Sequence, residues 1–425
     1  MEDSKKKLYP FKFIPIAEKV SWGGNVLVKN YNKKFFEPGL DGTDVALTAE
    51  DTVGESWELA DMGFRDSLVD NGWLGGNSIS DLMETYMERV VGDNVFEYYG
   101  RQFPLLIKVL DVRGKTPLMV SPDDEVAEQR YDALGKVKFW YIEDAEPGSK
   151  VYMGFKKDIS AQEFYERCHD GNIEELMNVI YPKKGDSFMI VPGLVHGAAD
   201  GLVIAEVAEA SDLDFKLFNW GKPTENDSVE ELSIEAAFDF LILSRYDESL
   251  FTKGRLWPHE EEHDHEGHEH HHHEVKIADK LAQCPQFTVT KISLTDPLHI
   301  YAEKFNSFLI YLCLEGEASI QVPAEKENGE KFMDNYVILA GDTLLVPNDI
   351  SDFFLVPRDR STILLESMIE KRDDVDPYIN PNAQPYLPGE EEDFEDPADA
   401  DHCDDDHCDD DHCDGHCEGH HHHHD

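Results

Sequence analysis

Two stretches of the chain decide its fold, "GDSFMIVPGLVH" at residues 185–196 and "GDTLLVPNDISD" at residues 341–352. Each begins with Gly-Asp, continues as an apolar strand, reaches a proline and ends 11 residues after its glycine. Such a repeat implies two related β-barrels in one chain. The first copy ends in His196, a potential metal ligand, whereas the second ends in Asp352 in a stretch without ligand spacing. We therefore expect the functional site in the first barrel.

The sequence around the repeats is rich in short strands. Residues 8–60, 103–222 and the chain from 286 onward alternate apolar runs with glycine and proline turns, which favours barrels or sandwiches. Residues 78–100 are expected to be helical, with Ser78 or Ser80 as N-cap. Residues 160–180 and 229–248 also show helical patterns. The fold class is therefore mostly β, with inserted and connecting helices.

Composition excludes several function classes. The chain has 425 residues, of which 40% are hydrophobic, and no apolar run reaches the ~18 residues that a membrane helix needs. The N-terminus has lysines but no apolar core, so we expect no secretory signal and a cytoplasmic location. The formal net charge of −51 argues against nucleic acids and anionic membranes as partners.

Two tracts hold 17 of the 20 histidines, at residues 259–274 and 402–425. The second repeats His-Cys with aspartates between, and its candidate ligands are His402, Cys403, His407, Cys408, His412, Cys413, His416 and Cys417. Such tracts cannot form a core, so we predict disorder and binding of a divalent transition metal. The alternatives are a solvated charged segment and, for the final histidines, a purification tag. The other cysteines, Cys168, Cys284 and Cys313, are expected to be ordinary buried thiols.

Further motifs carry a resemblance to a known family. They are "WGG" (22–24), "GESWE" (54–58), "FPLLIKVLD" (103–111), "SPDDE" (121–125), "GKVKFWYI" (135–142), "GDSFMIVPGLVH" (185–196) and "FKLFNWGK" (215–222). Together, in this order, they resemble the type I mannose-6-phosphate isomerases, which are double-cupin metalloenzymes of carbohydrate metabolism. The resemblance implies two cupin-like barrels, a sugar-phosphate substrate, zinc as cofactor and aldose–ketose isomerisation, in which the metal acts as a Lewis acid.

The resemblance also implies particular site residues, and this sequence departs from most of them. Family members hold zinc with Gln, His, Glu and His; here Met119, Ser121 and Lys138 stand in the first three places, and only His196 agrees. Lys216 stands in the place of a catalytic arginine, and Lys136 matches a lysine that faces the substrate. The implied catalytic residues are therefore Lys216, Lys136 and Lys138, and the implied substrate-binding residues are Lys136, Lys216 and Trp22.

These substitutions argue against a zinc site in the barrel. Zinc requires at least three nitrogen, sulfur or carboxylate ligands from protein, and a lysine ammonium repels a dication at contact distance. Lysine at position 216 also lacks the planar fork of arginine. Three alternatives stay open: an isomerase, a sugar-phosphate-binding or regulatory protein that has lost its chemistry, and a metal-buffering protein that uses its His/Cys tracts.

The patterns predict five segments along the chain. They are a first barrel at 8–225 with a helical insertion at about 78–100, a helical connection at 226–258, a His/Glu-rich disordered linker at 259–274, a second barrel at 275–375, and a disordered acidic tail at 376–425.

Overall fold

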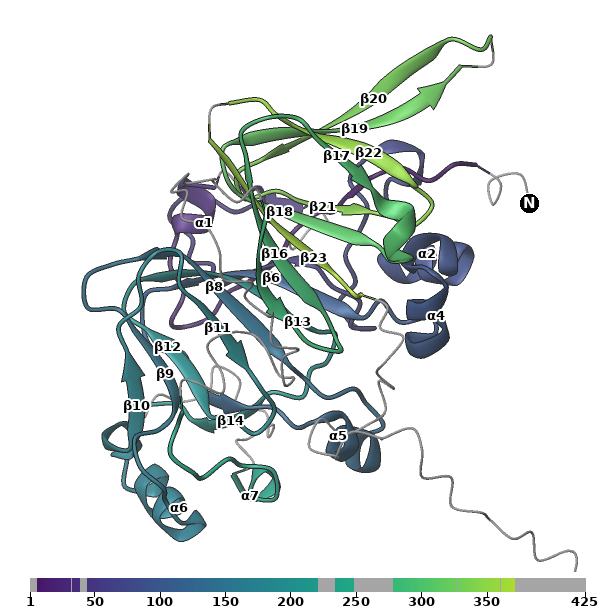
Figure 1. Cartoon of the computed structure of the whole chain (residues 1–425). Helices are drawn as coiled ribbons and strands as arrows, with labels where there is room; N and C mark the ends of the chain where they lie inside the picture. The colour runs from purple at the N-terminus through teal and green to yellow at the C-terminus, as the bar shows by residue number, and fades with distance from the viewer. Residues whose placement is uncertain are drawn as a thin grey trace, which may run out of the picture. The chain divides into compact units, whose positions relative to one another are not determined.

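The structure is a computed structural model, and it describes residues 6–31, 33–38, 44–220, 234–247, 278–326, 328–359 and 361–370. In this part of the chain the fold is mostly β, as predicted (Figure 1). Hydrogen bonding divides each expected barrel into two facing sheets, which are called here the first and the second sheet pair. The chain separates into two compact units, residues 1–381 and 382–425, and every described residue belongs to the first unit.

The first sheet pair is built from the N-terminal half. One sheet has the strand order β11 (Ser187–Ile190), β8 (Lys138–Ala145), β13 (Leu202–Glu209), β6 (Leu105–Val112), β5 (Glu55–Leu59) and β2 (Ile16–Glu18). The other has the order β10 (Met177–Ile180), β9 (Lys150–Phe155), β12 (His196–Ala199), β7 (Leu118–Val120) and β14 (Phe215–Phe218).

The second sheet pair is built mainly from the C-terminal half. One sheet has the order β1 (Phe11–Lys12), β21 (Thr343–Val346), β18 (Leu309–Glu315), β23 (Thr362–Met368), β16 (Thr288–Leu294) and β15 (Ala278–Gln283). The other has the order β17 (Leu298–Tyr301), β22 (Asp352–Pro357), β19 (Glu317–Glu325) and β20 (Lys331–Leu339). The N-terminal strand β1 therefore pairs with the second sheet pair, through Phe11 opposite Leu345. A small separate sheet joins β3 (Phe36–Pro38) to β4 (Asp44–Ala46).

The repeated sequence forms the same local structure twice. Gly185 and Gly341 both have positive φ, 95° and 88°, which glycine adopts without steric cost. Gly185 N donates to Ile142 O while Ile142 N donates to Asp186 O, and the same two bonds join Gly341 and Asp342 to Cys313. His196 and Asp352 then begin the next strands, β12 and β22. The predicted internal repeat is confirmed.

Helices cover the sheets at a few places. They are α1 (Val26–Lys29), α2 (Ile79–Tyr86), α3 (Glu88–Val91), α4 (Asp93–Tyr99), α5 (Asp124–Tyr131), α6 (Ala161–His169) and α7 (Ile234–Ala237). Ser78 caps α2 in a capping box with Asp81, which confirms one of the two expected N-caps. The helical insertion breaks at Met87 and Gly92, which both have positive φ. Asp123 caps α5, so the "SPDDE" motif starts a helix.

The predicted helix at 229–248 is shorter than expected among the described residues, because residues 238–247 are not helical. Phe240 N and Leu241 N still donate to Ala237 O, but Ile242 N donates to Gly193 O and Tyr246 N donates to Phe155 O, so the later residues bond to the first sheet pair. Phe238, Leu241 and neighbouring side chains pack on the apolar cluster beneath α6. Tertiary contacts here override a helical sequence pattern.

Side chains of alternate strand residues build separate cores. The outer faces of the two six-stranded sheets share one apolar cluster, which includes Ile107, Val109, Ile310 and Leu312. A second cluster fills the interior of the second sheet pair, and a third fills part of the first. Cys168, Cys284 and Cys313 are free buried thiols, as expected. Burial raises the pKa of Cys168 and of Cys313 to about 12, so both thiols are unreactive.

Candidate functional site: a buried ionic cluster

The interior of the first sheet pair has two chemically different ends. At one end Leu110, Trp140, Ile142, Met153 and Ile204 pack in an apolar cluster together with Trp22. At the other end the strands contribute lysine, histidine and carboxylate side chains. Charged groups are found buried in this way only when they are paired. This second end is the candidate site, and it is called here the ionic cluster.

Asp214 is the centre of the ionic cluster. Its Oδ1 lies 2.5 Å from Lys138 Nζ and its Oδ2 lies 2.8 Å from Lys136 Nζ. Ser121 Oγ also donates to Asp214 Oδ1 at 2.8 Å, and Lys136 Nζ donates to Ser211 O at 2.5 Å. Lys136 and Lys138 are 2% and 1% exposed. One carboxylate is therefore shared by two lysines that water barely reaches.

The charges in this cluster shift the proton affinities of its members. Burial raises the pKa of Asp214, but Lys136 and Lys138 outweigh burial and hold that pKa well below its usual range. Burial lowers the pKa of Lys136 although Asp214 opposes the change. Because its pKa is lowered, Asp214 is an ionised carboxylate at neutral pH.

His196 completes the contacts of Lys138. Its Nε2 lies 3.1 Å from Lys138 Nζ, and its Nδ1 lies 3.0 Å from Leu194 O. An ammonium can only donate, so Nε2 is the acceptor and Nδ1 carries the proton that it donates to Leu194 O. Burial and then the charge of Lys138 lower the pKa of His196 to about 3, so the ring is neutral at physiological pH. The lone pair of His196 is thus used by a lysine of the same chain.

A second group of charges lies further along the same strands. Glu206 and Lys108 are opposite each other in the β13–β6 register, with Lys108 Nζ 4.0 Å from Glu206 Oε1 and 2.9 Å from Glu55 Oε2. Trp140 Nε1 donates to Glu206 Oε2 at 2.6 Å. Burial lowers the pKa of Lys108, but Glu55 and Glu206 outweigh it and the pKa is raised. Three lysines (108, 136 and 138) thus meet three carboxylates (55, 206 and 214), so the cluster balances its charge.

The structure brings some of the sequence-predicted residues together and separates others. Lys136, Lys138, Ser121 and His196 meet in the ionic cluster. Met119 is half-buried and lies opposite both His196 and Lys216, which puts the three residues on one face of their sheet. Lys216 is exposed on the edge strand β14, and Trp22 is packed in the apolar end at 7% exposure. The tracts at 259–274 and 402–425 lie outside the described residues.

Sequence reasoning missed Asp214, Glu206, Lys108 and Glu55. A signal was present for two of them, because Lys108 stands alone in the apolar run "LLIKVL" and Glu206 stands alone in "VIAEVA". A single charge in each of two buried strands, with opposite signs, predicts that the strands pair and that the charges face each other. Asp214 gave no such signal, since it lies in a polar stretch before β14.

The residues at this position do not fit a zinc ion. A zinc site needs at least three nitrogen, sulfur or carboxylate ligands, and the lone pair of His196 already faces an ammonium. Ser121 and Met119 are poor zinc ligands. Among the residues that the structure describes, no group of three or more His, Cys, Asp and Glu side chains is arranged to hold a metal ion. The described part also contains no helix long and apolar enough to span a membrane.

Comparisons with known proteins agree with the fold and with the motifs. A family model described as phosphomannose isomerase type I, catalytic domain, matches residues 11–154. The mannose-6-phosphate isomerase ManA of Bacillus subtilis is 25% identical over 348 residues, which cover 81% of this chain and 95% of that protein. A mannose-6-phosphate isomerase of Streptococcus mutans is 25% identical over 332 residues, which cover 78% and 90%.

Solved structures show the same architecture. The crystal structure of the mannose 6-phosphate isomerase from Bacillus subtilis matches with a TM-score of 0.66 and 22% identity, covering 85% of this chain and 99% of that one. A putative mannosephosphate isomerase from Archaeoglobus fulgidus matches with a TM-score of 0.61 and 20% identity, covering 86% and 100%. Two repeated sheet pairs with a cluster of polar side chains inside the first define a double-cupin protein. In its fold, and in the family model that matches residues 11–154, the chain is similar to the type I phosphomannose isomerases.

Proposed function

We propose that this chain is a sugar-phosphate-binding protein on the isomerase fold and that it does not catalyse zinc-dependent isomerisation. The observation that carries the proposal is the position of Lys138 Nζ, 3.1 Å from His196 Nε2 and 2.5 Å from Asp214 Oδ1. The histidine lone pair that would bind a metal is directed at an ammonium of the protein. No other described residue supplies the missing ligands.

Binding of an anionic sugar is supported by the edge of the site. Lys216 is exposed and lies on the same sheet face as His196. The lysines of the ionic cluster are matched by carboxylates, so Lys216 is the cation that we expect to attract a phosphate group. Exposed ammonium groups contribute through long-range attraction, which salt screens. Lys136 and Trp22, which the resemblance implies as substrate contacts, are buried and are not expected to touch the ligand first.

The test combines turnover with binding on the full chain. Interconversion of mannose 6-phosphate and fructose 6-phosphate is measured in a coupled assay with zinc in excess and with a chelator, and we expect none in either condition. Calorimetry should detect heat for mannose 6-phosphate and none for mannose. Lys216→Ala should weaken that binding about tenfold, a change of about 1.4 kcal/mol, while the matched exposed variant Lys156→Ala should not change it.

Three results would overturn this function. Zinc-dependent turnover would mean that a metal site forms in spite of Lys138. Turnover without metal that is lost in Lys138→Ala would mean that the ammonium itself polarises the sugar carbonyl. Equal heats of binding for mannose and mannose 6-phosphate would mean that the protein does not recognise the phosphate group.

Metal binding by the His-Cys tail remains a separate prediction, together with the five-segment division of the chain and its cytoplasmic location. The tail carries eight His and Cys ligands with aspartates between them, a donor set that suits zinc, nickel or copper. Equilibrium dialysis should show zinc bound to the full chain and most of it lost when Cys403, Cys408, Cys413 and Cys417 are all changed to serine. An unchanged zinc content would contradict the prediction.

A further inference from the structure

The ionic cluster contains a set of donors that surrounds one carboxylate, and Asp214 supplies that carboxylate. Asp214 Oδ1 lies 2.5 Å from Lys138 Nζ and accepts from Ser121 Oγ at 2.8 Å. Asp214 Oδ2 accepts from Lys136 Nζ at 2.8 Å. The three donor residues Ser121, Lys136 and Lys138 are called here the cradle. Two ammonium groups and a hydroxyl around a planar group with two oxygens form the strong, charge-assisted contacts that carboxylates favour.

The cradle and the carboxylate that it holds differ in how firmly the fold positions them. The side chains of Lys136 and Lys138 are each 2% exposed, whereas the side chain of Asp214 is 21% exposed. Asp214 comes directly before β14, an edge strand that among the described strands pairs only with β7, with a register shift. Segments with few main-chain partners open at low free-energy cost. Asp214 is therefore the member of the cluster that can turn towards solvent while the lysines stay in place.

The two lysines of the cradle have contacts that do not depend on Asp214. Lys138 Nζ lies 3.1 Å from His196 Nε2, and Lys136 Nζ donates to Ser211 O at 2.5 Å. Both acceptors are neutral groups, so each buried ammonium still requires a nearby anion. A carboxylate of a ligand would restore the contacts that Asp214 makes. Exchange of one carboxylate for another leaves the charge inside the cluster unchanged.

Lys216 lies beside the cradle on the same face of the sheet. Ser121 contacts Asp214, and Met119 lies opposite Lys216, so these four side chains share one face of the β7–β14 pair. Two residues along a strand span about 7 Å, which separates Lys216 from the position of Asp214. Lys216 is exposed, whereas the cradle is buried. A ligand with one anionic group at each end of a short carbon chain matches this pair of positions.

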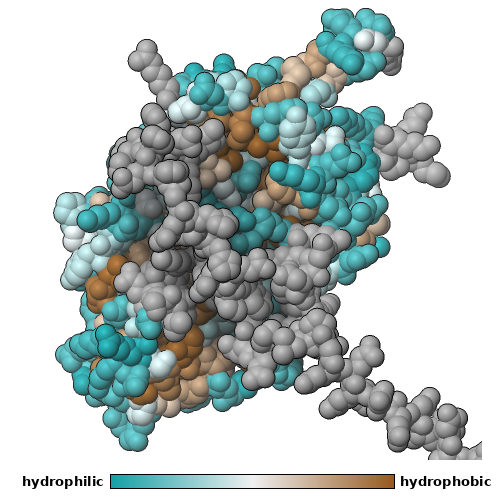
Figure 2. Space-filling view, viewed as in Figure 1, coloured by the Kyte–Doolittle hydropathy of each residue, from teal (hydrophilic) through white to brown (hydrophobic). Residues whose placement is uncertain are grey.

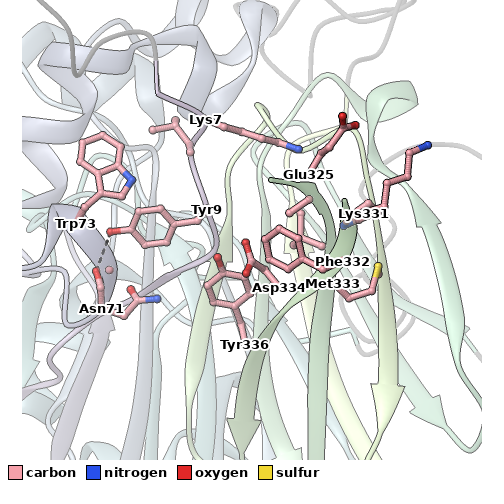
Figure 3. Close-up of a pocket in the computed structure, with 15 residues that line it drawn as sticks. Lys7, Tyr9, Asn71, Trp73, Glu325, Lys331, Phe332, Met333, Asp334 and Tyr336 are labelled. Atoms are coloured by element: carbon pink, nitrogen blue, oxygen red, sulfur yellow. Dashed lines mark hydrogen bonds between the residues drawn. The ribbon is translucent and has the colours of Figure 1, made fainter. Parts of the chain in front are cut away.

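The groove between the N-terminal segment and the hairpin of β19 and β20 offers no such selection for anions. Tyr9 and Tyr336 are stacked in it with ring centroids 6.4 Å apart (Figure 3). Figure 2 shows hydrophobic surface along this hairpin next to its hydrophilic tip. The charged side chains that line the groove have both signs, and they are Lys7, Lys331, Glu325 and Asp334. An anionic ligand is therefore better matched by the cradle and Lys216.

We propose that the sugar phosphate bound by this protein is a phosphorylated sugar acid, whose carboxylate takes the place of Asp214 in the cradle and whose phosphate binds Lys216. This assignment rests on the proposed sugar-phosphate binding and adds the chemical class of the sugar. Asp214 is then an internal competitor that occupies the cradle until such a ligand binds. An aldose phosphate has a phosphate for Lys216 but no carboxylate for the cradle, so it binds more weakly.

The first experiment compares two ligands by calorimetry on the full chain. 6-Phosphogluconate carries a phosphate and a carboxylate, and glucitol 6-phosphate has the same open chain without the carboxylate. We expect 6-phosphogluconate to bind about tenfold more tightly, because its carboxylate adds charge-assisted hydrogen bonds. Asp214→Ala should bind 6-phosphogluconate more tightly than the natural chain does, since no internal carboxylate competes. The exposed neighbouring variant Asp212→Ala should bind it as the natural chain does.

The outcomes separate this proposal from the proposed function. Equal affinities for 6-phosphogluconate and glucitol 6-phosphate would overturn the acid class and leave sugar-phosphate binding intact. An equal gain for both ligands in Asp214→Ala would mean that the cradle binds phosphate, which also contradicts the proposal. No binding of either ligand would overturn the proposal and the proposed function together.

The second experiment tests the cradle without any sugar. Asp214→Ala leaves two buried lysines without their carboxylate, and acetate should raise its midpoint of urea denaturation by binding the folded state. Chloride at the same ionic strength should raise it less. The natural chain, in which Asp214 occupies the cradle, should respond equally to both salts. Equal responses of Asp214→Ala to acetate and chloride would contradict a carboxylate site. If Asp214→Ala does not fold in either salt, the two affinities of the natural chain decide the proposal.

Discussion

The two sheet pairs share a repeat and a topology, yet their interiors are filled with different chemistry. The second interior is apolar, with Ile320, Leu344, Phe353, Leu355 and Leu364 packed together. Its buried polar contact is Tyr311 OH, which donates to Glu366 Oε2 at 2.6 Å. The first interior keeps an apolar end but places three lysines and three carboxylates at the other.

This difference concerns the interactions that stabilise each interior. An apolar interior is stabilised by burial, at about 25 cal/mol per Å² of apolar surface. A buried ion cluster contributes little net stability, because removing the charges from water costs about as much as their attraction returns. A gain in stability therefore does not explain the ionic cluster, whereas it does explain the apolar second interior.

The largest change in stability is expected when the central carboxylate of the ionic cluster is removed. Asp214→Asn leaves Lys136 and Lys138 buried without a counter-charge, and we expect a loss of about 3 kcal/mol or more in the free energy of unfolding. Urea denaturation at pH 7 measures it. The exposed neighbour Asp212→Asn is the control, and a loss below about 0.5 kcal/mol in Asp214→Asn would mean that the cluster is not charged as described.

The next effect is a pH dependence confined to the first interior. The pKa of His196 is about 3 in the folded chain and near 6.5 in the unfolded chain. Below pH 6.5 the unfolded chain therefore binds a proton at His196 that the folded chain does not bind. Stability should therefore fall by about 1.4 kcal/mol for each pH unit below 6.5, and should not depend on His196 above it. Unfolding at pH 6.5 and 5.0 should show this slope in the natural chain and not in His196→Gln. Identical slopes would contradict a neutral, buried imidazole.

A smaller change in the free energy of unfolding is expected when Glu366, in the second interior, is replaced by glutamine. Burial raises the pKa of Glu366, and Glu366→Gln keeps an oxygen that accepts from Tyr311 OH. We expect a change below about 1 kcal/mol, since no buried cation loses its partner there. This variant is the matched counterpart of Asp214→Asn, because both replace a carboxylate by its amide. If the two amide variants lost the same stability, the comparison between the interiors would fail.

The smallest expected effect on stability is at the edge of the site. Lys216→Ala should change the free energy of unfolding by less than about 0.5 kcal/mol, because the side chain is exposed and surface charges contribute little. Thermal unfolding checks it. A large loss would place Lys216 inside the ionic cluster and would remove it as a contact for a ligand.

The sequence by itself determined the local chemistry of this protein. The Gly-Asp repeats, the Ser78 cap and the buried cysteines were predicted because each depends on a residue's own conformational preference or on its nearest neighbours. The same holds for Met119, Ser121 and Lys138, whose departure from the ligands that the resemblance implies is a matter of residue type. The resemblance to the type I isomerases also rests on the order of the motifs in the sequence.

The tertiary structure decided how those residues meet. Asp214 and Lys138 are 76 positions apart in sequence, and only the pairing of β8, β13, β6 and β7 with their neighbours brings them within 2.5 Å. Strand β1 pairs with the second sheet pair, and residues 238–247 are not helical although their sequence pattern predicts a helix. Part of this segment instead forms hydrogen bonds with the first sheet pair. These outcomes depend on contacts between distant segments, whose energies outweigh local preferences and leave no trace in spacing or composition.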